Sequence, residues 1–142
     1  MQRWLVAVAL GLAACDLSTY SRRTITINVV LEPVNNSGVS GYAQIVRRTN
    51  EPTALTVNLQ GLRPSTEYPG QAIRGSCAQP GEPREPLPTL RGDTRGQAQT
   101  RTTTVPDSVL QQGFALRYLQ AGTVVACGTI IEASFPRSDT IR

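Results

Sequence analysis

The stretch Thr24-Ile25-Thr26-Ile27-Asn28-Val29-Val30-Leu31 (residues 24–31) decides the fold class. Ile25, Ile27, Val29 and Leu31 occupy every second position, and successive side chains of a β-strand point to opposite faces of its sheet. The sequence therefore predicts a half-buried strand with these four side chains on the inner face.

Further segments repeat this alternation and are separated by turn residues. Asn35-Asn36-Ser37-Gly38 suits a turn because Asn and Gly tolerate positive φ, and Asn50-Glu51-Pro52 breaks the chain again. We expect strands near residues 40–47, 53–60, 71–75, 96–104, 114–118 and 124–131, the last buried on both faces. Pro106–Leu110 suits a single helical turn. With no apolar stripe of 3.6-residue period, the sequence predicts an all-β fold, an antiparallel sandwich or barrel of about seven to eight strands.

One segment does not fit the strand pattern. Gln79–Pro88 is rich in proline, and proline donates no hydrogen bond to a neighbouring strand. We expect a long surface loop here, partly in the polyproline II conformation. A P-x-x-P recognition motif is the alternative to simple loop punctuation.

The composition excludes many activities. The chain has 142 residues and a formal net charge of +4, and all 14 basic residues are arginines because lysine and histidine are absent. Serine–histidine triads, H-E-x-x-H zinc sites, serine–lysine dyads and Schiff-base chemistry are therefore excluded. Aromatic residues are few, and Trp4, the only tryptophan, lies in a segment that we expect to be removed. Stacking platforms for bases are thus missing, and no nucleic-acid partner is expected.

The N-terminal segment has the layout of an export signal. A short positive stretch, Met1–Arg3, precedes an apolar run, Trp4–Ala14, that is too short to span a bilayer. Leu12-Ala13-Ala14-Cys15 resembles the lipobox of bacterial lipoproteins. The resemblance implies a signal peptide at 1–14, acyl chains on Cys15, a lipidated tether at 15–23 and a membrane-anchored, extracytoplasmic domain, periplasmic or at the cell surface. An ordinary signal peptide with an incidental Cys15 is the alternative.

Two cysteines remain for the exported domain. An oxidising compartment favours a disulfide between Cys77 and Cys127, which would close a loop of about 50 residues and contribute up to about 4 kcal/mol. Two buried free thiols are the alternative.

Several runs together resemble the copper–zinc superoxide dismutase superfamily, and most closely its small secreted bacterial variants. They are Leu55–Pro64, Gly75-Ser76-Cys77, Pro106–Leu110, Gly113–Tyr118 and Val125-Ala126-Cys127-Gly128-Thr129-Ile130. The resemblance covers about residues 24–131, and a tail follows at 132–142. It implies a Greek-key β-barrel in which the two cysteines link a loop to the last strand.

The chemistry of that superfamily does not carry over. Its His-x-His copper ligands would fall on Gln71-Ala72-Ile73, and a later ligand strand ends here in Leu119. Copper and zinc sites of this kind need imidazole nitrogens, so we expect a domain without a metal site, a cofactor or dismutase activity.

Two clusters of charged residues are candidate sites. Arg91, Arg95 and Arg101 are close in sequence, near Arg74 and Arg84 if the chain folds back, and together they could bind anionic lipid headgroups or an anionic envelope polymer. A solvated basic face is the alternative. The carboxylates of Glu82, Glu85 and Asp93 could form an acid–base pair, although a mobile loop is a poor support for one.

These observations favour a non-enzymatic role, the binding or scaffolding of an envelope component or another protein by a lipid-anchored domain. The runner-up is an accessory in copper or redox homeostasis that docks on a metalloprotein or retains degenerate superoxide dismutase activity.

Overall fold

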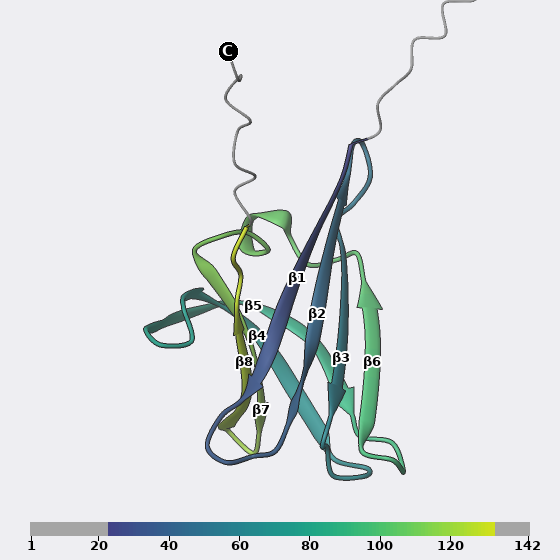
Figure 1. Cartoon of the computed structure of the whole chain (residues 1–142), viewed down its shortest axis with the longest axis vertical. Coiled ribbons are helices and arrows are strands. Elements are labelled where there is room, and N and C mark those ends of the chain that lie inside the picture. Colours follow the sequence, from purple (N-terminus) through teal and green to yellow (C-terminus); the bar gives the residue numbers. More distant parts are fainter. Residues whose placement is uncertain (1–22, 133–142) are drawn as a thin grey trace, which may run out of the picture.

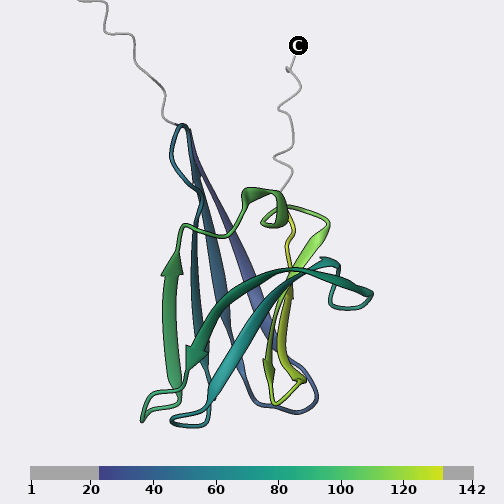
Figure 2. The same ribbon diagram turned by 180° about the vertical axis from the view of Figure 1, so that it is seen from behind.

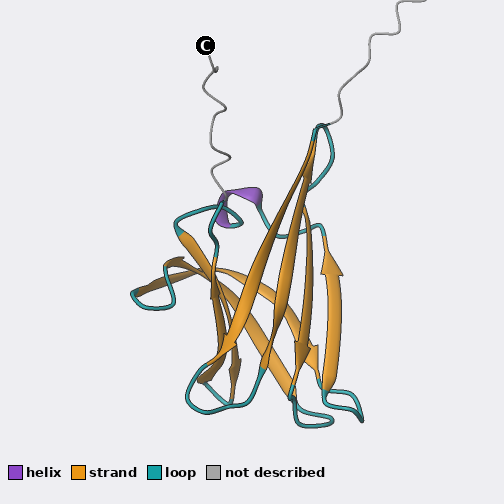
Figure 3. Cartoon of the chain, in the orientation of Figure 1, coloured by secondary structure: helices purple, strands orange, loops and turns teal. Residues whose placement is uncertain are grey.

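The computed structural model describes residues 23–132, and within them the chain folds almost entirely into strands (Figures 1 and 3). The elements are β1 (Thr24–Pro33), β2 (Ser40–Arg48), β3 (Ala54–Gln60), β4 (Glu67–Gly75), β5 (Pro80–Arg91), β6 (Gln97–Thr102), a short 3₁₀ turn η1 (Asp107–Val109), β7 (Phe114–Gln120) and β8 (Thr123–Thr129). The all-β prediction is confirmed, and so is the single helical turn after Pro106.

The eight strands form one curled antiparallel sheet in the order β5-β4-β7-β8-β1-β2-β3-β6. We call β1, β2, β3 and β6 the first half-sheet, and β4, β5, β7 and β8 the second. Figures 1 and 2 show the two halves facing each other as a half-barrel. Their hydrogen-bonded junction is short, because β1 pairs with β8 only at Glu32↔Cys127 and Pro33↔Ala126.

The main core lies between the two half-sheets. Its largest buried members are Leu31, Ile45, Leu55 and Val57 from the first half and Tyr68, Leu116 and Tyr118 from the second, with Leu110 from the β6–β7 connection. Each such side chain contributes roughly 1.5–3 kcal/mol on burial. No polar or charged residue within 23–132 is buried, so the interior is wholly apolar.

The alternation in residues 24–31 is confirmed for Ile27, Val29 and Leu31, which are all buried. The prediction for Ile25 is wrong, since half of its surface is exposed. Ile25 pairs with Arg47 near the end of β2. The start of β1 and the end of β2 project together beyond the second half-sheet (Figure 1). Nothing therefore covers the inner face of β1 at that point.

The turn chemistry is confirmed. Asn35, Asn36 and Gly38 all have positive φ, as does Asn50 in the β2–β3 turn. The Asn35 side chain also donates a hydrogen bond to the Val124 carbonyl at 3.0 Å, so the first turn is attached to β8.

The expected strands are found with shifts of a few residues. The largest shift is in β4, which begins at Glu67 rather than Gln71 because Pro69 and Gly70 disguise its alternation. A Cβ at Gly70 would lie 2.7 Å from the Tyr118 ring, so glycine here leaves room for that buried tyrosine.

The prediction of a long loop at Gln79–Pro88 is wrong, because most of it belongs to β5. This strand pairs with β4 in an irregular register that shifts three times, and it forms one edge of the sheet. Prolines are tolerated at edges and bulges, where the missing N–H leaves no partner unsatisfied. The narrower expectation that this segment is not a central strand is confirmed.

Two connections cross between the half-sheets at the same end and hydrogen-bond to each other. Leu62 in the β3–β4 connection donates to the Gly96 carbonyl at 2.9 Å, and Ser65 donates to the Gly92 carbonyl at 2.8 Å. A Cβ at Gly92 would lie 2.3 Å from the Arg63 carbonyl oxygen. The crossing therefore requires glycine.

The disulfide between Cys77 and Cys127 is present. It attaches the β4–β5 turn to β8, and the Cys77 N–H donates to the Thr129 hydroxyl at 3.0 Å. On this outer face Ile73, Ala115 and Cys127 form a second small core. Residues 125–128 are consequently buried without interruption, which confirms that the last strand is covered on both faces.

The signal peptide, Cys15, the tether up to residue 22 and the tail beyond Glu132 lie outside the described residues, so those predictions stay predictions. Within residues 23–132, the structure contains no helix that is long and apolar enough to cross a membrane.

Replacing both cysteines of the disulfide (Cys77→Ser with Cys127→Ser) should lower the free energy of unfolding by about 2–4 kcal/mol, because the unfolded chain regains the freedom of a long loop. Guanidinium unfolding followed by circular dichroism measures this. A reductant should bring the wild type to the stability of the double variant and leave the variant unchanged. Equal midpoints for wild type and variant would contradict the role assigned to the bond.

Candidate functional site

The positions that the superfamily resemblance assigns to metal ligands lie on the outer face of the second half-sheet. Gln71 stands opposite Arg117 in the β4–β7 pairing, and the Arg117 guanidinium donates to the Gln71 amide oxygen from Nε at 3.1 Å and from Nη2 at 2.9 Å. Ile73 is fully buried in the second core. Leu119 follows Arg117 by two residues along β7 and so shares its face.

This donor set does not fit copper or zinc, which require imidazole, thiolate or carboxylate ligands. Of the three positions Gln71, Ile73 and Leu119, only Gln71 offers a ligand-type atom, and its amide oxygen already accepts two hydrogen bonds from Arg117. A metal ion here would meet the positive charge of Arg117. Among the described residues, no group of three His, Cys, Asp or Glu side chains comes together.

The buried tyrosine Tyr118 is also unsuited to chemistry. Burial raises the pKa of its hydroxyl well above the usual value, so the group is protonated at neutral pH. Among the described residues, its hydroxyl makes one hydrogen bond, a long one of 3.5 Å to the carbonyl of Pro88.

The three carboxylates considered as an acid–base pair are not brought together. Glu82 and Glu85 lie on β5, and Asp93 lies in the turn beyond that strand. From Glu85 to Arg91, the last residue of β5, the extended chain covers about 20 Å at 3.4 Å per residue, and Asp93 lies beyond that end.

Asp93 has a structural role in its turn. Its Oδ1 accepts the backbone N–H groups of Gln97 at 2.9 Å and Arg95 at 2.8 Å. Chiefly the Gln97 bond holds the pKa of Asp93 below its usual range.

The candidate arginines are spread out. Arg91 ends β5 opposite Glu67, Arg95 lies in the turn beside Asp93, and Arg101 lies on β6 opposite Thr56. Four residues of β6 separate Arg101 from the turn side of that strand, about 14 Å.

The condition for Arg84 to lie near Arg91, a chain that folds back between them, is not met, because both residues lie on the extended strand β5. Arg84 and Arg91 are seven positions apart along the strand, about 24 Å. Ile73, the neighbour of Arg74, pairs with Pro83 in the same distant part of β5.

The structure contains a groove that the sequence analysis missed. It has a volume of about 670 Å³ and lies on the first half-sheet. The outward side chains that line it are Val30, Glu32, Ser40, Tyr42, Asn58, Gln60, Gln97 and Gln99, with Asp93 at its end. One feature of the sequence could have indicated this groove. The outward positions of these strands carry amides and hydroxyls, whereas charged residues are usual at such positions.

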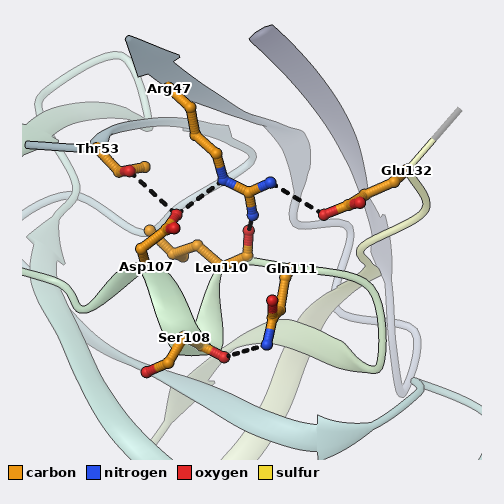
Figure 4. A network of polar contacts seen from close by, with 7 residues as sticks. All are labelled: Arg47, Thr53, Asp107, Ser108, Leu110, Gln111 and Glu132. Atoms are coloured by element: carbon orange, nitrogen blue, oxygen red, sulfur yellow. Dashed lines mark hydrogen bonds and ion pairs between the residues drawn. The ribbon is translucent and has the colours of Figure 1, made fainter. Parts of the chain in front are cut away.

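A polar network closes the opposite end of the barrel (Figure 4). The Arg47 guanidinium contacts Asp107 at 2.8 Å, Glu132 at 3.1 Å and the carbonyl of Leu110. Thr53 donates to the same carboxylate of Asp107 at 3.0 Å. The network fastens the β6–β7 connection to β2, and with its three nitrogens engaged Arg47 is a structural residue.

No family model matches this chain, and no curated protein matches its sequence.

Arg47→Ala should lower the free energy of unfolding by about 2–3 kcal/mol, because it leaves the Leu110 carbonyl and Asp107 without their charged partner. The matched control is Arg48→Ala, which removes only an exposed ion pair with Glu51 and should cost less than about 1 kcal/mol. Denaturant unfolding of both variants measures the difference. Equal losses would show that the network does not stabilise this end of the barrel.

Proposed function

We propose that this chain is a lipid-anchored, extracytoplasmic binding protein, and that its domain is a superoxide dismutase-like Greek-key barrel without a metal site or enzymatic activity. One observation carries the proposal. Where the resemblance would place copper ligands, Arg117 donates two hydrogen bonds to Gln71, and the neighbouring position is the buried, apolar Ile73.

The strand order supports the Greek-key part of the proposal. In that motif three consecutive strands are followed by a fourth that returns beside the first. Here β7 returns to lie beside β4 and β5, as the motif requires. β5 and β6 are the two edges of the curled sheet and would complete the order β7-β4-β5-β6 only by facing each other across its opening. The disulfide between the β4–β5 turn and β8 agrees with the link that the resemblance implies.

Two features support a role in binding rather than in catalysis. The chain lacks histidine and lysine, which are common acids, bases and nucleophiles. Apart from the hydroxyls of Tyr68 and Tyr118, the core between the half-sheets holds only apolar groups, and burial keeps the Tyr118 hydroxyl protonated. Recognition through the outer surface is the role that these residues can perform.

The position of the proposed lipid anchor determines which end of the domain can meet a binding partner. Thr24, the residue nearest Cys15 that belongs to a strand, lies at one end of the barrel, and the 92–96 turn lies at the other (Figure 1). The ten residues of β1 cover about 31 Å along this direction. A domain tethered at Thr24 thus presents its far end, with Arg91 and Arg95, away from its own membrane. An envelope polymer or a neighbouring protein is better placed than the anchoring lipid to meet that end.

Intact-mass and native mass spectrometry of the full chain, extracted from bacterial membranes, test this proposal. The expected species begins at Cys15, carries acyl chains on that residue, contains one disulfide, and retains no metal after incubation with Cu²⁺ and Zn²⁺ and removal of the excess. Cys15→Ser is the matched control and should appear in the soluble fraction without acyl chains.

Near one copper or zinc ion per chain would overturn the metal-free barrel. An unmodified Cys15 would overturn the lipid anchor.

A further inference from the structure

The groove on the first half-sheet differs in charge from the rest of the chain. The protein carries a net charge of +4, yet none of the described residues that line the groove is basic. Its two charged side chains, Glu32 and Asp93, are acidic. A phosphate or carboxylate ligand would find no cationic partner there and would meet two carboxylates, so the groove selects against anions.

The groove is rich in uncommitted amide groups. Within the described part of the chain, the side chains of Asn58, Gln97 and Gln99 have no hydrogen-bond partner, and Gln60 reaches Ser40 only at 3.3 Å. Each amide offers two N–H donors and an accepting oxygen. Such pairs match a ligand hydroxyl, which both donates and accepts.

An aromatic ring lies at the centre of this polar surface. Val30, Tyr42, Asn58 and Gln99 form one row across β1, β2, β3 and β6. Tyr42 is 52% exposed, and Val30 beside it is 66% exposed. A ring of this kind contacts apolar C–H groups through its face while its hydroxyl stays in water.

Other occupants fit less well. An extended peptide binds by adding to a sheet edge through its backbone. The groove is centred on the face of β2 and β3, which are paired on both sides, and only its β6 border is a sheet edge. A second protein copy would need an apolar core to the interface, and only Val30 and Tyr42 could supply one.

We infer that the groove formed by Tyr42, Asn58, Gln60, Gln97 and Gln99 binds an uncharged carbohydrate chain. A sugar ring has an apolar C–H face for Tyr42 and a rim of hydroxyls for the amides. The volume, about 670 Å³, lies within the roughly 300–1,000 Å³ typical of ligand sites. The inference rests on the proposed binding role and names the ligand class for it. The groove lies toward the end of β1 remote from Thr24, which in a protein tethered through Cys15 is the end farther from the anchor.

Isothermal titration calorimetry of the full chain, in a detergent without a sugar headgroup, tests the inference with cellohexaose, maltohexaose and chitohexaose. At least one should bind saturably. Tyr42→Ala should weaken that binding about 3- to 10-fold through loss of the stacking contact, and Gln99→Ala should weaken it by a similar factor through loss of hydrogen bonds. The matched controls Ile25→Ala and Gln44→Ala change exposed or half-buried side chains of the same half-sheet outside the groove and should bind as the wild type does.

Absence of binding to all three oligosaccharides, or undiminished binding by both groove variants, would overturn the inference. Dextran sulfate and phosphatidylglycerol vesicles are the comparison ligands. Salt-sensitive binding to these alone, lost when Arg91, Arg95 and Arg101 are replaced by Gln, would move the site from the groove to the arginines while leaving the proposed binding role intact. Retention of copper or zinc would instead count against that role.

Discussion

The structure depends on the mutual burial of two apolar sheet faces. Leu31, Ile45 and Leu55 on one half-sheet pack against Leu116 and Tyr118 on the other, while only two residue pairs join the halves through β1 and β8. Because the backbone junction between the half-sheets is so short, the apolar core would be open to water at both ends of the curled sheet. The connections between strands must therefore cover these two ends. At one end the β3–β4 and β5–β6 connections hydrogen-bond to each other. At the other, the β6–β7 connection inserts Val109 and Leu110 into the core and is fastened there by Arg47.

A wholly apolar interior directs function to the outside, and the two outer faces are not equivalent. The second half-sheet is covered where the disulfide-linked turn lies over Ile73 and Ala115, and the Arg117–Gln71 pair occupies its remaining polar site. The first half-sheet leaves its outer face open, with a groove whose side chains are mostly uncharged amides and hydroxyls, together with the acidic Glu32 and Asp93. The outer face of the second half-sheet is thus occupied by its own side chains, which argues against a metal centre there. The outer face of the first half-sheet stays available for a ligand.

The sequence predicted the parts of the fold that depend on local alternation and turn chemistry. Ile27, Val29 and Leu31 face the core, and Asn35 and Asn36 adopt positive φ as expected. The failures came from tertiary context. Ile25 follows the same period but lies beyond the partner half-sheet, and the prolines after Gln79 are compatible with a strand only because β5 forms an edge.

The sites were predictable to different degrees. Pairing of Cys77 with Cys127 was predicted because only two cysteines remain in the exported domain and an oxidising compartment is expected. The structure contains that bond. The arginines that are neighbours in sequence are distributed along β5 and β6, because an extended strand separates residues instead of gathering them. The groove was missed because its residues come from four strands, and outward polar positions have no periodic signal that distinguishes a site from solvent-facing surface.

We propose that the open face of the first half-sheet, and not the face that carries Gln71 and Arg117, is the functional surface. NMR chemical-shift mapping of the ¹⁵N-labelled protein tests it most directly, with neutral oligosaccharide and copper added in separate titrations. The account predicts that oligosaccharide shifts the amide signals around Tyr42, Asn58 and Gln99, and that copper leaves those of Gln71 and Arg117 unchanged. Copper-induced shifts centred on Gln71 and Arg117, with none around Tyr42 on adding oligosaccharide, would contradict it.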